Sequence, residues 1–65
     1  MKIEMTLKMW RMTKGYTQEE MAKKIGVHPN TYVKWEKRPD MISLKNADKI
    51  ARIFGTKREE IFPQS

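Results

Sequence analysis

The sequence predicts an all-α protein, a compact bundle of about five short helices that forms a single domain over residues 1–65. Three observations support this prediction. A chain of 65 residues without cysteine must build one small core from packed secondary structure alone. Apolar residues recur at a spacing of three and four, and no alternating pattern is long enough to predict a strand. Each of the three glycines, at positions 15, 26 and 55, follows a run of helix-forming residues.

The first helix is expected over about residues 3–13, ahead of Gly15. Ile3, Leu7 and Trp10 fall on one helical face, which is expected to point into the core. The opposite face carries three methionines, Met5, Met9 and Met12. Flexible thioethers on an outer face suit an adaptable contact with another protein. The alternative is a first helix that is rotated or starts later, so that some of these methionines complete the core.

The second helix is expected to begin after Thr17, because Thr17 and Glu20 have the spacing of a capping box. It is expected to end at Gly26, and only two residues separate this stop from Pro29, which suits the first turn of a third helix. Pro39 prevents that third helix from continuing. The residues expected to fill the corner between the two helices are mostly apolar: Met21, Ala22, Ile25, Val27, Tyr32 and Trp35.

A fourth helix is expected between Ser43 and Gly55, with a hydroxyl cap at its start and a glycine at its end. Apolar residues at helical spacing predict its buried face: Leu44, Ala47, Ile50, Ala51 and Phe54. Thr56 and Glu59 have the spacing of a second capping box, which predicts a short last helix. The proline at position 63 is expected to end the domain.

The composition favours an acidic polymer as partner and argues against an enzyme. Lysine and arginine outnumber aspartate and glutamate by 14 to 8, which gives a net charge of +6. With His28 as the one histidine and no cysteine, no nucleophile has a base to activate it, and no glycine-rich phosphate loop is present. No apolar run approaches the roughly 20 residues of a membrane span. We therefore expect a soluble cytoplasmic protein that is not an enzyme and needs no metal or cofactor.

Residues 17–37 have the pattern of a helix-turn-helix, in which two helices cross steeply over a tight turn. Ala22 is small at the point where the following helix passes over it. Gly26 can adopt the left-handed conformation that reverses the chain. The helix expected at residues 29–37 then has an outer side that is free for contacts, and this side carries Asn30, Val33, Lys34 and Lys37.

Over nearly its whole length, the sequence resembles the phage repressor/Cro-type (XRE-like) helix-turn-helix family. The residues that carry the resemblance are LKMWR at 7–11, KGYTQEEMA at 14–22, IGV at 25–27, WE at 35–36 and ARIFG at 51–55. The resemblance implies a lambda-repressor-like fold with a recognition helix at about residues 29–37. It also implies a small transcriptional regulator, repressor-like in action, whose ligand is double-stranded operator DNA.

The resemblance assigns roles to individual residues. Four residues of the recognition helix are expected to contact bases: Pro29, Asn30, Val33 and Lys34. Asparagine can pair with adenine, lysine can donate to guanine, and an apolar side chain can contact a thymine methyl group. Six residues around the helix-turn-helix are expected to contact phosphates: Thr17, Gln18, His28, Thr31, Lys37 and Arg38. Gln18 also matches the family residue that braces the recognition helix.

Arg11 and Glu36 match family positions that form an internal ion pair between the first helix and the recognition helix. Such a pair fixes geometry more than it stabilises, because desolvation offsets much of the attraction. Ile61 and Phe62 resemble the C-terminal region through which related domains pair, so the resemblance implies a homodimer on a two-fold symmetric operator. Five positions depart from the family pattern: His28, Pro29, Tyr32, Arg38 and Pro39.

A second class of function stays open: a helix-turn-helix module that regulates by binding a protein, such as a toxin or a polymerase subunit. Residues 17–36 carry equal numbers of acidic and basic side chains, so the predicted recognition unit is itself neutral and the net charge of +6 lies in its flanks. In this interpretation, the outward polar residues of 29–37 form an ordinary solvated helix face. The cationic residues of the fourth helix are expected on its solvated face in either case: Lys45, Lys49 and Arg52.

Overall fold

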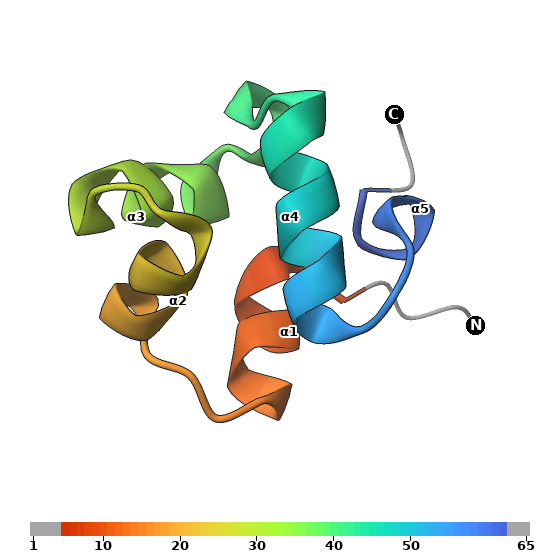
Figure 1. The fold of residues 1–65 in the computed structure, drawn as a ribbon, viewed down its shortest axis with the longest axis horizontal. Coiled ribbons are helices and arrows are strands. Elements are labelled where there is room, and N and C mark those ends of the chain that lie inside the picture. The colour runs from red at the N-terminus through yellow and green to blue at the C-terminus, as the bar shows by residue number, and fades with distance from the viewer. Residues whose placement is uncertain (1–4, 63–65) are drawn as a thin grey trace.

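The computed structural model describes residues 5–62, which form five α-helices and one short 3₁₀ helix (Figure 1). In chain order these are α1 (Leu7–Thr13), α2 (Gln18–Ile25), α3 (Pro29–Lys37), η1 (Pro39–Met41), α4 (Leu44–Phe54) and α5 (Arg58–Ile61). No strand occurs within residues 5–62, and the predicted all-α bundle of five short helices is confirmed. The longest of these helices, α4, has 11 residues, and none in this range has the length and apolar character of a membrane span.

Helix α1 begins later than the spacing of apolar residues predicts. Thr6 is its N-cap, and the Thr6 hydroxyl oxygen accepts a hydrogen bond from the Met9 amide at 3.2 Å. The Thr6 amide donates in turn to the Met9 sulfur at 3.5 Å, so methionine completes a capping box that normally uses Glu or Gln. The predicted start near residue 3 is therefore wrong, and Ile3 lies outside the described residues. Met5 precedes the helix and is half-buried, whereas Met9 and Met12 are exposed.

The turn between α2 and α3 follows from local sequence signals. The Thr17 hydroxyl accepts from the Glu20 amide at 3.0 Å, and the Glu20 carboxylate accepts from the Thr17 amide at 2.8 Å, so the predicted capping box is present. Gly26 ends α2 in the left-handed conformation, with φ of 93°. Glycine adopts this conformation readily because it lacks a Cβ atom. His28 then caps α3, since its Nδ1 atom accepts a hydrogen bond from the Asn30 amide at 3.1 Å.

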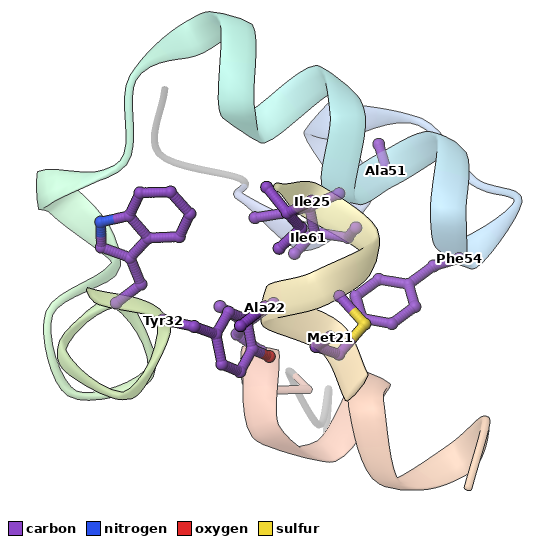
Figure 2. Packing of buried hydrophobic residues seen from close by; sticks show 10 residues of the cluster. Met21, Ala22, Ile25, Tyr32, Ala51, Phe54 and Ile61 are labelled. Atoms are coloured by element: carbon purple, nitrogen blue, oxygen red, sulfur yellow. The ribbon is translucent and has the colours of Figure 1, made fainter. Parts of the chain in front are cut away.

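The core contains buried side chains from all five α-helices (Figure 2). Its most completely buried members are Met21 of α2, Tyr32 of α3 and Ile50 of α4. Trp10 of α1 stacks on Phe54 of α4, with their ring centroids 5.9 Å apart. The helix-turn-helix therefore does not stand alone, because α1, α4 and α5 complete the apolar cluster into which its inner face packs.

Two apolar residues at helix ends contradict the sequence-based expectations. Leu44, expected in the buried face of α4, is exposed; it is the first residue of that helix and follows the end of η1 by three positions. Ile61, expected to be available for pairing with a second copy, is only 6% exposed and belongs to the core. Phe62 is half-buried and packs against the same core. Ile61 is therefore not free to form the predicted C-terminal contact.

The start of α5 also differs from the prediction. A capping box of Thr56 and Glu59 would place the first helical residue at position 57, but α5 begins one residue later, at Arg58. The Thr56 hydroxyl instead donates to the Glu60 carboxylate. The Arg58 guanidinium donates to the Asp48 carboxylate at 2.9 Å, which attaches α5 to α4. The proline at position 63 lies outside the described residues.

Candidate nucleic-acid interface

Helix α3 has one buried face and one outward face. Tyr32 and Trp35 are buried in the core, whereas Asn30, Lys34 and Lys37 are exposed. Three further residues of the expected interface are half-buried: Pro29, Thr31 and Val33. Asn30, Val33 and Lys34 follow Pro29 by one, four and five positions. The four residues expected to contact bases therefore share two adjacent turns of α3. We call this set the base patch: Pro29, Asn30, Val33 and Lys34.

The six residues expected to contact phosphates lie at the ends of the two helices. Thr17 and Gln18 begin α2, His28 and Thr31 lie at the start of α3, and Lys37 and Arg38 lie at its end. Along the chain, five of them lie before or after the base patch, whereas Thr31 lies within it. The Nδ1 atom of His28 accepts the Asn30 amide, so the proton of the neutral ring is on Nε2, which is left to donate to a ligand.

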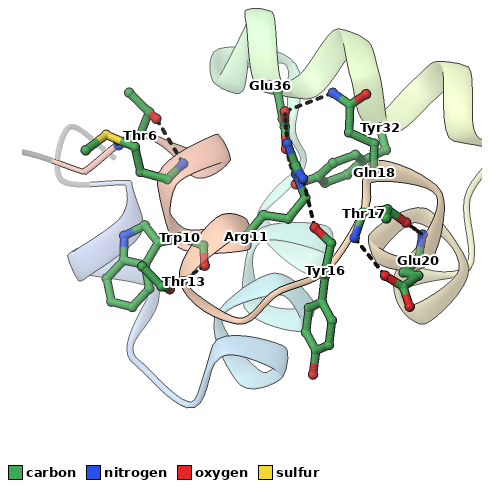
Figure 3. A network of polar contacts seen from close by, with 11 residues as sticks. Thr6, Trp10, Arg11, Thr13, Tyr16, Thr17, Gln18, Glu20, Tyr32 and Glu36 are labelled. Atoms are coloured by element: carbon green, nitrogen blue, oxygen red, sulfur yellow. Dashed lines mark hydrogen bonds and ion pairs between the residues drawn. The ribbon is translucent and has the colours of Figure 1, made fainter.

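A buried carboxylate joins α3 to the two helices that precede it (Figure 3). Glu36 accepts hydrogen bonds from Arg11 Nε at 2.6 Å, from Gln18 Nε2 at 3.0 Å and from the Tyr32 hydroxyl at 2.6 Å. Arg11 also donates from Nη1 to the Tyr16 carbonyl at 2.8 Å. The Arg11 and Glu36 side chains are only 11% and 5% exposed. This network fixes the orientation of α3 against α1 and α2.

The network also determines the ionisation of its members. Burial alone would raise the pKa of the Glu36 carboxyl, but hydrogen bonds from Arg11, Tyr32 and Gln18 outweigh burial and hold that pKa below its usual value. Burial, and then the hydrogen bond to Glu36, raise the pKa of the Tyr32 hydroxyl. The hydrogen bond to Glu36 raises the pKa of the Arg11 guanidinium, although burial opposes it. At neutral pH the network therefore holds a carboxylate, a guanidinium and a neutral phenol.

We expect this network to make folding stability fall at both ends of the pH range. Glu36 has a lowered pKa, so its contribution is complete above its unfolded pKa of about 4.3 and is lost as the pH falls through the folded value. Tyr32 has a raised pKa, so its contribution is complete below its unfolded pKa of about 10 and is lost as the pH rises above it. Urea melts of the wild type and Tyr32→Phe check this from about pH 3 to about pH 11. An alkaline loss of equal size in both proteins would contradict the assignment to Tyr32.

Three contacts of the interface region are absent from the sequence-based predictions. Tyr32 is expected only as a core aromatic, yet its hydroxyl binds Glu36, and their spacing of four on one helix is the signal that would reveal the contact. Lys49 is expected on the solvated face of α4, but its Nζ donates to the Ile25 carbonyl at the end of α2, at 3.4 Å. A cation at this position stabilises the negative end of the helix dipole. The third contact is the cap of α3, in which His28 Nδ1 accepts the Asn30 amide.

An outward helix with a polar patch, held over a tight turn against a second helix and followed by cationic residues, is the arrangement of a helix-turn-helix DNA-binding domain. The chain belongs to the helix-turn-helix family, whose model matches residues 7–61. This match confirms the resemblance noted in the sequence. As a member of this family, the protein is a DNA-binding transcriptional regulator.

Similar proteins carry compatible descriptions. The chain is 48% identical over 56 residues to an uncharacterized HTH-type transcriptional regulator of Methanocaldococcus jannaschii, which covers 86% of this chain and 85% of that protein. An uncharacterized HTH-type transcriptional regulator of Archaeoglobus fulgidus is also 48% identical over 56 residues. This match covers 86% of this chain and 79% of that protein. The cryptic phage CTXphi transcriptional repressor RstR of Vibrio cholerae is 34% identical over 55 residues. This match covers 85% of this chain and 50% of that repressor. No solved structure matches the chain significantly.

Proposed function

We propose that this protein is a repressor-like regulator that acts in the cytoplasm and binds double-stranded operator DNA sequence-specifically, with α3 in the major groove. The base patch supports this function most strongly, because it lies on a helix whose opposite face is buried. The groove admits an α-helix, and each base pair shows it a distinct pattern of donors and acceptors. The Glu36 network supports the proposal, because base contacts need a recognition helix with a fixed orientation.

The base patch combines polar and apolar contacts. Asn30 is exposed near the start of α3, and its side-chain amide can donate to and accept from the major-groove edge of adenine. Lys34 lies one turn further along and can donate to guanine or to a phosphate. Pro29 and Val33, four residues apart, form an apolar strip that suits thymine methyl groups. We therefore propose a half-site in which A·T pairs face the first two turns of α3.

Phosphate contacts from the flanking residues would set the register of the protein on the duplex. Lys37 and Arg38 are exposed at the end of α3 and can approach one strand as flexible cations. Gln18 is constrained differently, because its Nε2 atom already donates to Glu36. Its second Nε2 hydrogen and its backbone amide, at the first position of α2, remain for a phosphate. Gln18 would then join the DNA backbone to the network that orients α3.

A domain of this size covers about one half-site, so we propose that two copies bind a two-fold symmetric operator. The contact between the copies requires exposed surface on each of them. Ile61 does not provide it, because this residue lies in the core of its own chain. Of the two C-terminal residues expected to pair, only the half-buried Phe62 keeps exposed surface for this contact.

Two substitutions separate base contacts from phosphate contacts. Asn30→Ala should weaken binding to the cognate site by about 1–3 kcal/mol and relax the preference at one base position, because the paired hydrogen bonds are lost. Lys37→Ala should weaken binding to every sequence alike, because phosphates carry no sequence information. Fluorescence anisotropy on the cognate duplex and on a scrambled duplex, at one fixed salt concentration, measures both effects.

Lys8→Ala is the matched control, because Lys8 is exposed on α1, outside the proposed interface. This substitution removes the same charge as Lys37→Ala. If Asn30→Ala acted equally on both duplexes, Asn30 would not contact a base. If neither Asn30→Ala nor Lys37→Ala changed binding, the function would instead be contact with another protein. The exposed Met9 and Met12 side chains of α1 would then offer the contact surface, with Met5 half-buried beside them.

A further inference from the structure

The capping box of α1 uses a methionine sulfur where the capping box of α2 uses a carboxylate. The Thr6 amide donates to the Met9 sulfur at 3.5 Å, and the Thr6 hydroxyl accepts from the Met9 amide at 3.2 Å. In α2 the bond that corresponds to the first of these runs to the Glu20 carboxylate at 2.8 Å. A thioether sulfur is a weak acceptor. The start of α1 therefore has the geometry of a capping box but a weak bond in place of one strong bond.

The Met9 side chain is open to small reagents in solution. It is 41% exposed, whereas Met21 in the core is 0% exposed. Met12 lies one turn further along α1 and is 60% exposed. Within residues 5–62, Met9 is the methionine whose sulfur accepts a hydrogen bond. Exposed methionines are oxidised before buried ones, so a mild oxidant reaches Met9 and Met12 while Met21 stays protected.

The oxidant that we consider is a peroxide, and the product is methionine sulfoxide. A lone pair of the Met9 sulfur attacks one oxygen of hydrogen peroxide, which forms the S–O bond and breaks the O–O bond. The departing hydroxide takes the proton from the transferred oxygen and becomes water. The sulfur has then lost two electrons, and the peroxide has been reduced by two electrons.

The oxygen added to Met9 improves the acceptor of the Thr6 amide. Rotation about the flexible bonds of the side chain brings this oxygen to the amide, where an N–H···O bond has an ordinary length of about 2.7–3.2 Å. The first turn of α1 holds no acidic residue, so the negative end of the S–O dipole is the first such charge at the positive end of the helix dipole. Oxidation disrupts a core by placing a polar group in it, but Met9 lies outside the buried cluster.

We propose that Met9 is a site of oxidation by peroxides, and that its sulfoxide strengthens the cap of α1 instead of disrupting the fold. Met12 is oxidised under the same conditions without effect on the cap. Arg11 follows Met9 by two residues on α1, and its guanidinium binds Glu36 of the recognition helix. The strengthened cap therefore stabilises the helix that holds α3 in its orientation.

Two matched variants test the proposal, and each keeps one of the two exposed methionines of α1. Met12→Leu/Met41→Leu keeps Met9, and Met9→Leu/Met41→Leu keeps Met12. Both also keep the half-buried Met5, whose oxidation affects the two proteins alike. Each protein is melted before and after treatment with hydrogen peroxide, and mass spectrometry of its peptides identifies the oxidised residues. Oxidation of Met9 should raise the Tm by about 2–8 °C, whereas oxidation of Met12 should leave the Tm unchanged.

Two further measurements assign the gain to the cap. Met9→Gln should raise the Tm without peroxide, because glutamine is a usual member of a capping box. The NMR signal of the Thr6 amide proton should move to lower field in Met9→Gln and in the peroxide-treated protein, and Met12→Gln should leave it in place. A Tm that falls or stays the same after oxidation of Met9 would overturn the proposal. Complete oxidation of Met12 in wild-type protein whose Met9 stays unmodified would overturn it as well.

Discussion

Glu36→Ala should lower the free energy of unfolding by about 3–5 kcal/mol, because it leaves the Arg11 guanidinium buried without a counter-charge. The same change removes the acceptor of the Gln18 amide and of the Tyr32 hydroxyl, which lies in the core. A domain of 65 residues has a total stability of about 3–10 kcal/mol, so this loss is at least about a third of the total. Urea melts at low temperature measure the loss.

Replacing both members of the ion pair should lower the free energy of unfolding less than removing one of them. The double variant Arg11→Met/Glu36→Leu removes both charges and should lose considerably less stability than Glu36→Ala. In the double variant the Tyr32 hydroxyl has lost its acceptor, Glu36. Adding Tyr32→Phe removes this hydroxyl and should therefore raise the free energy of unfolding again. Small and equal losses from Glu36→Ala and Arg11→Ala would mean that the two charges are solvated in solution and do not orient α3.

Raising the salt concentration from about 50 to about 200 mM should weaken operator binding by roughly 10³–10⁵, given about 6–10 phosphate contacts for two copies. The physical reason is the release of counterions from the duplex when cationic groups replace them. The +6 charge of each copy makes this term large even though residues 17–36 are neutral by themselves. Anisotropy titrations on the selected duplex at several salt concentrations give the slope.

Lys37→Ala should reduce the salt slope by about one for each copy, because it removes one phosphate contact per half-site. Lys8→Ala should leave the slope unchanged, since Lys8 lies on α1. A loss of affinity below about tenfold over this salt range would indicate at most two phosphate contacts per complex. The phosphate roles of the residues at both ends of α3 would then be wrong.

The parts of the fold that local chemistry determines were predictable from the sequence. The capping box at Thr17 and the left-handed end at Gly26 each depend on a few neighbouring residues, and they locate α2 and the tight turn. The expectation of a link between Arg11 and Glu36 came from the family resemblance, because no local pattern connects residues 25 positions apart. The roles of the interface residues toward DNA stay predictions.

The features that sequence reasoning misplaced depend on tertiary packing or on uncommon partners. Met9 caps α1 through its sulfur, which a search for Glu or Gln at that position overlooks. Leu44 and Ile61 are both apolar residues at helix ends, yet one is exposed and the other buried. Helical spacing cannot separate these cases, because the neighbouring elements decide which end of a helix is covered.

Selection of bound duplexes from a random DNA library shows most directly whether α3 reads base sequence. We expect enrichment of an inverted repeat whose half-site centres lie about 10–10.5 base pairs apart. Selection with Asn30→Ala should return the same repeat with one position per half-site relaxed. Recovery of an unenriched library, from wild-type protein that is folded and binds DNA at low salt, would contradict sequence-specific recognition by α3.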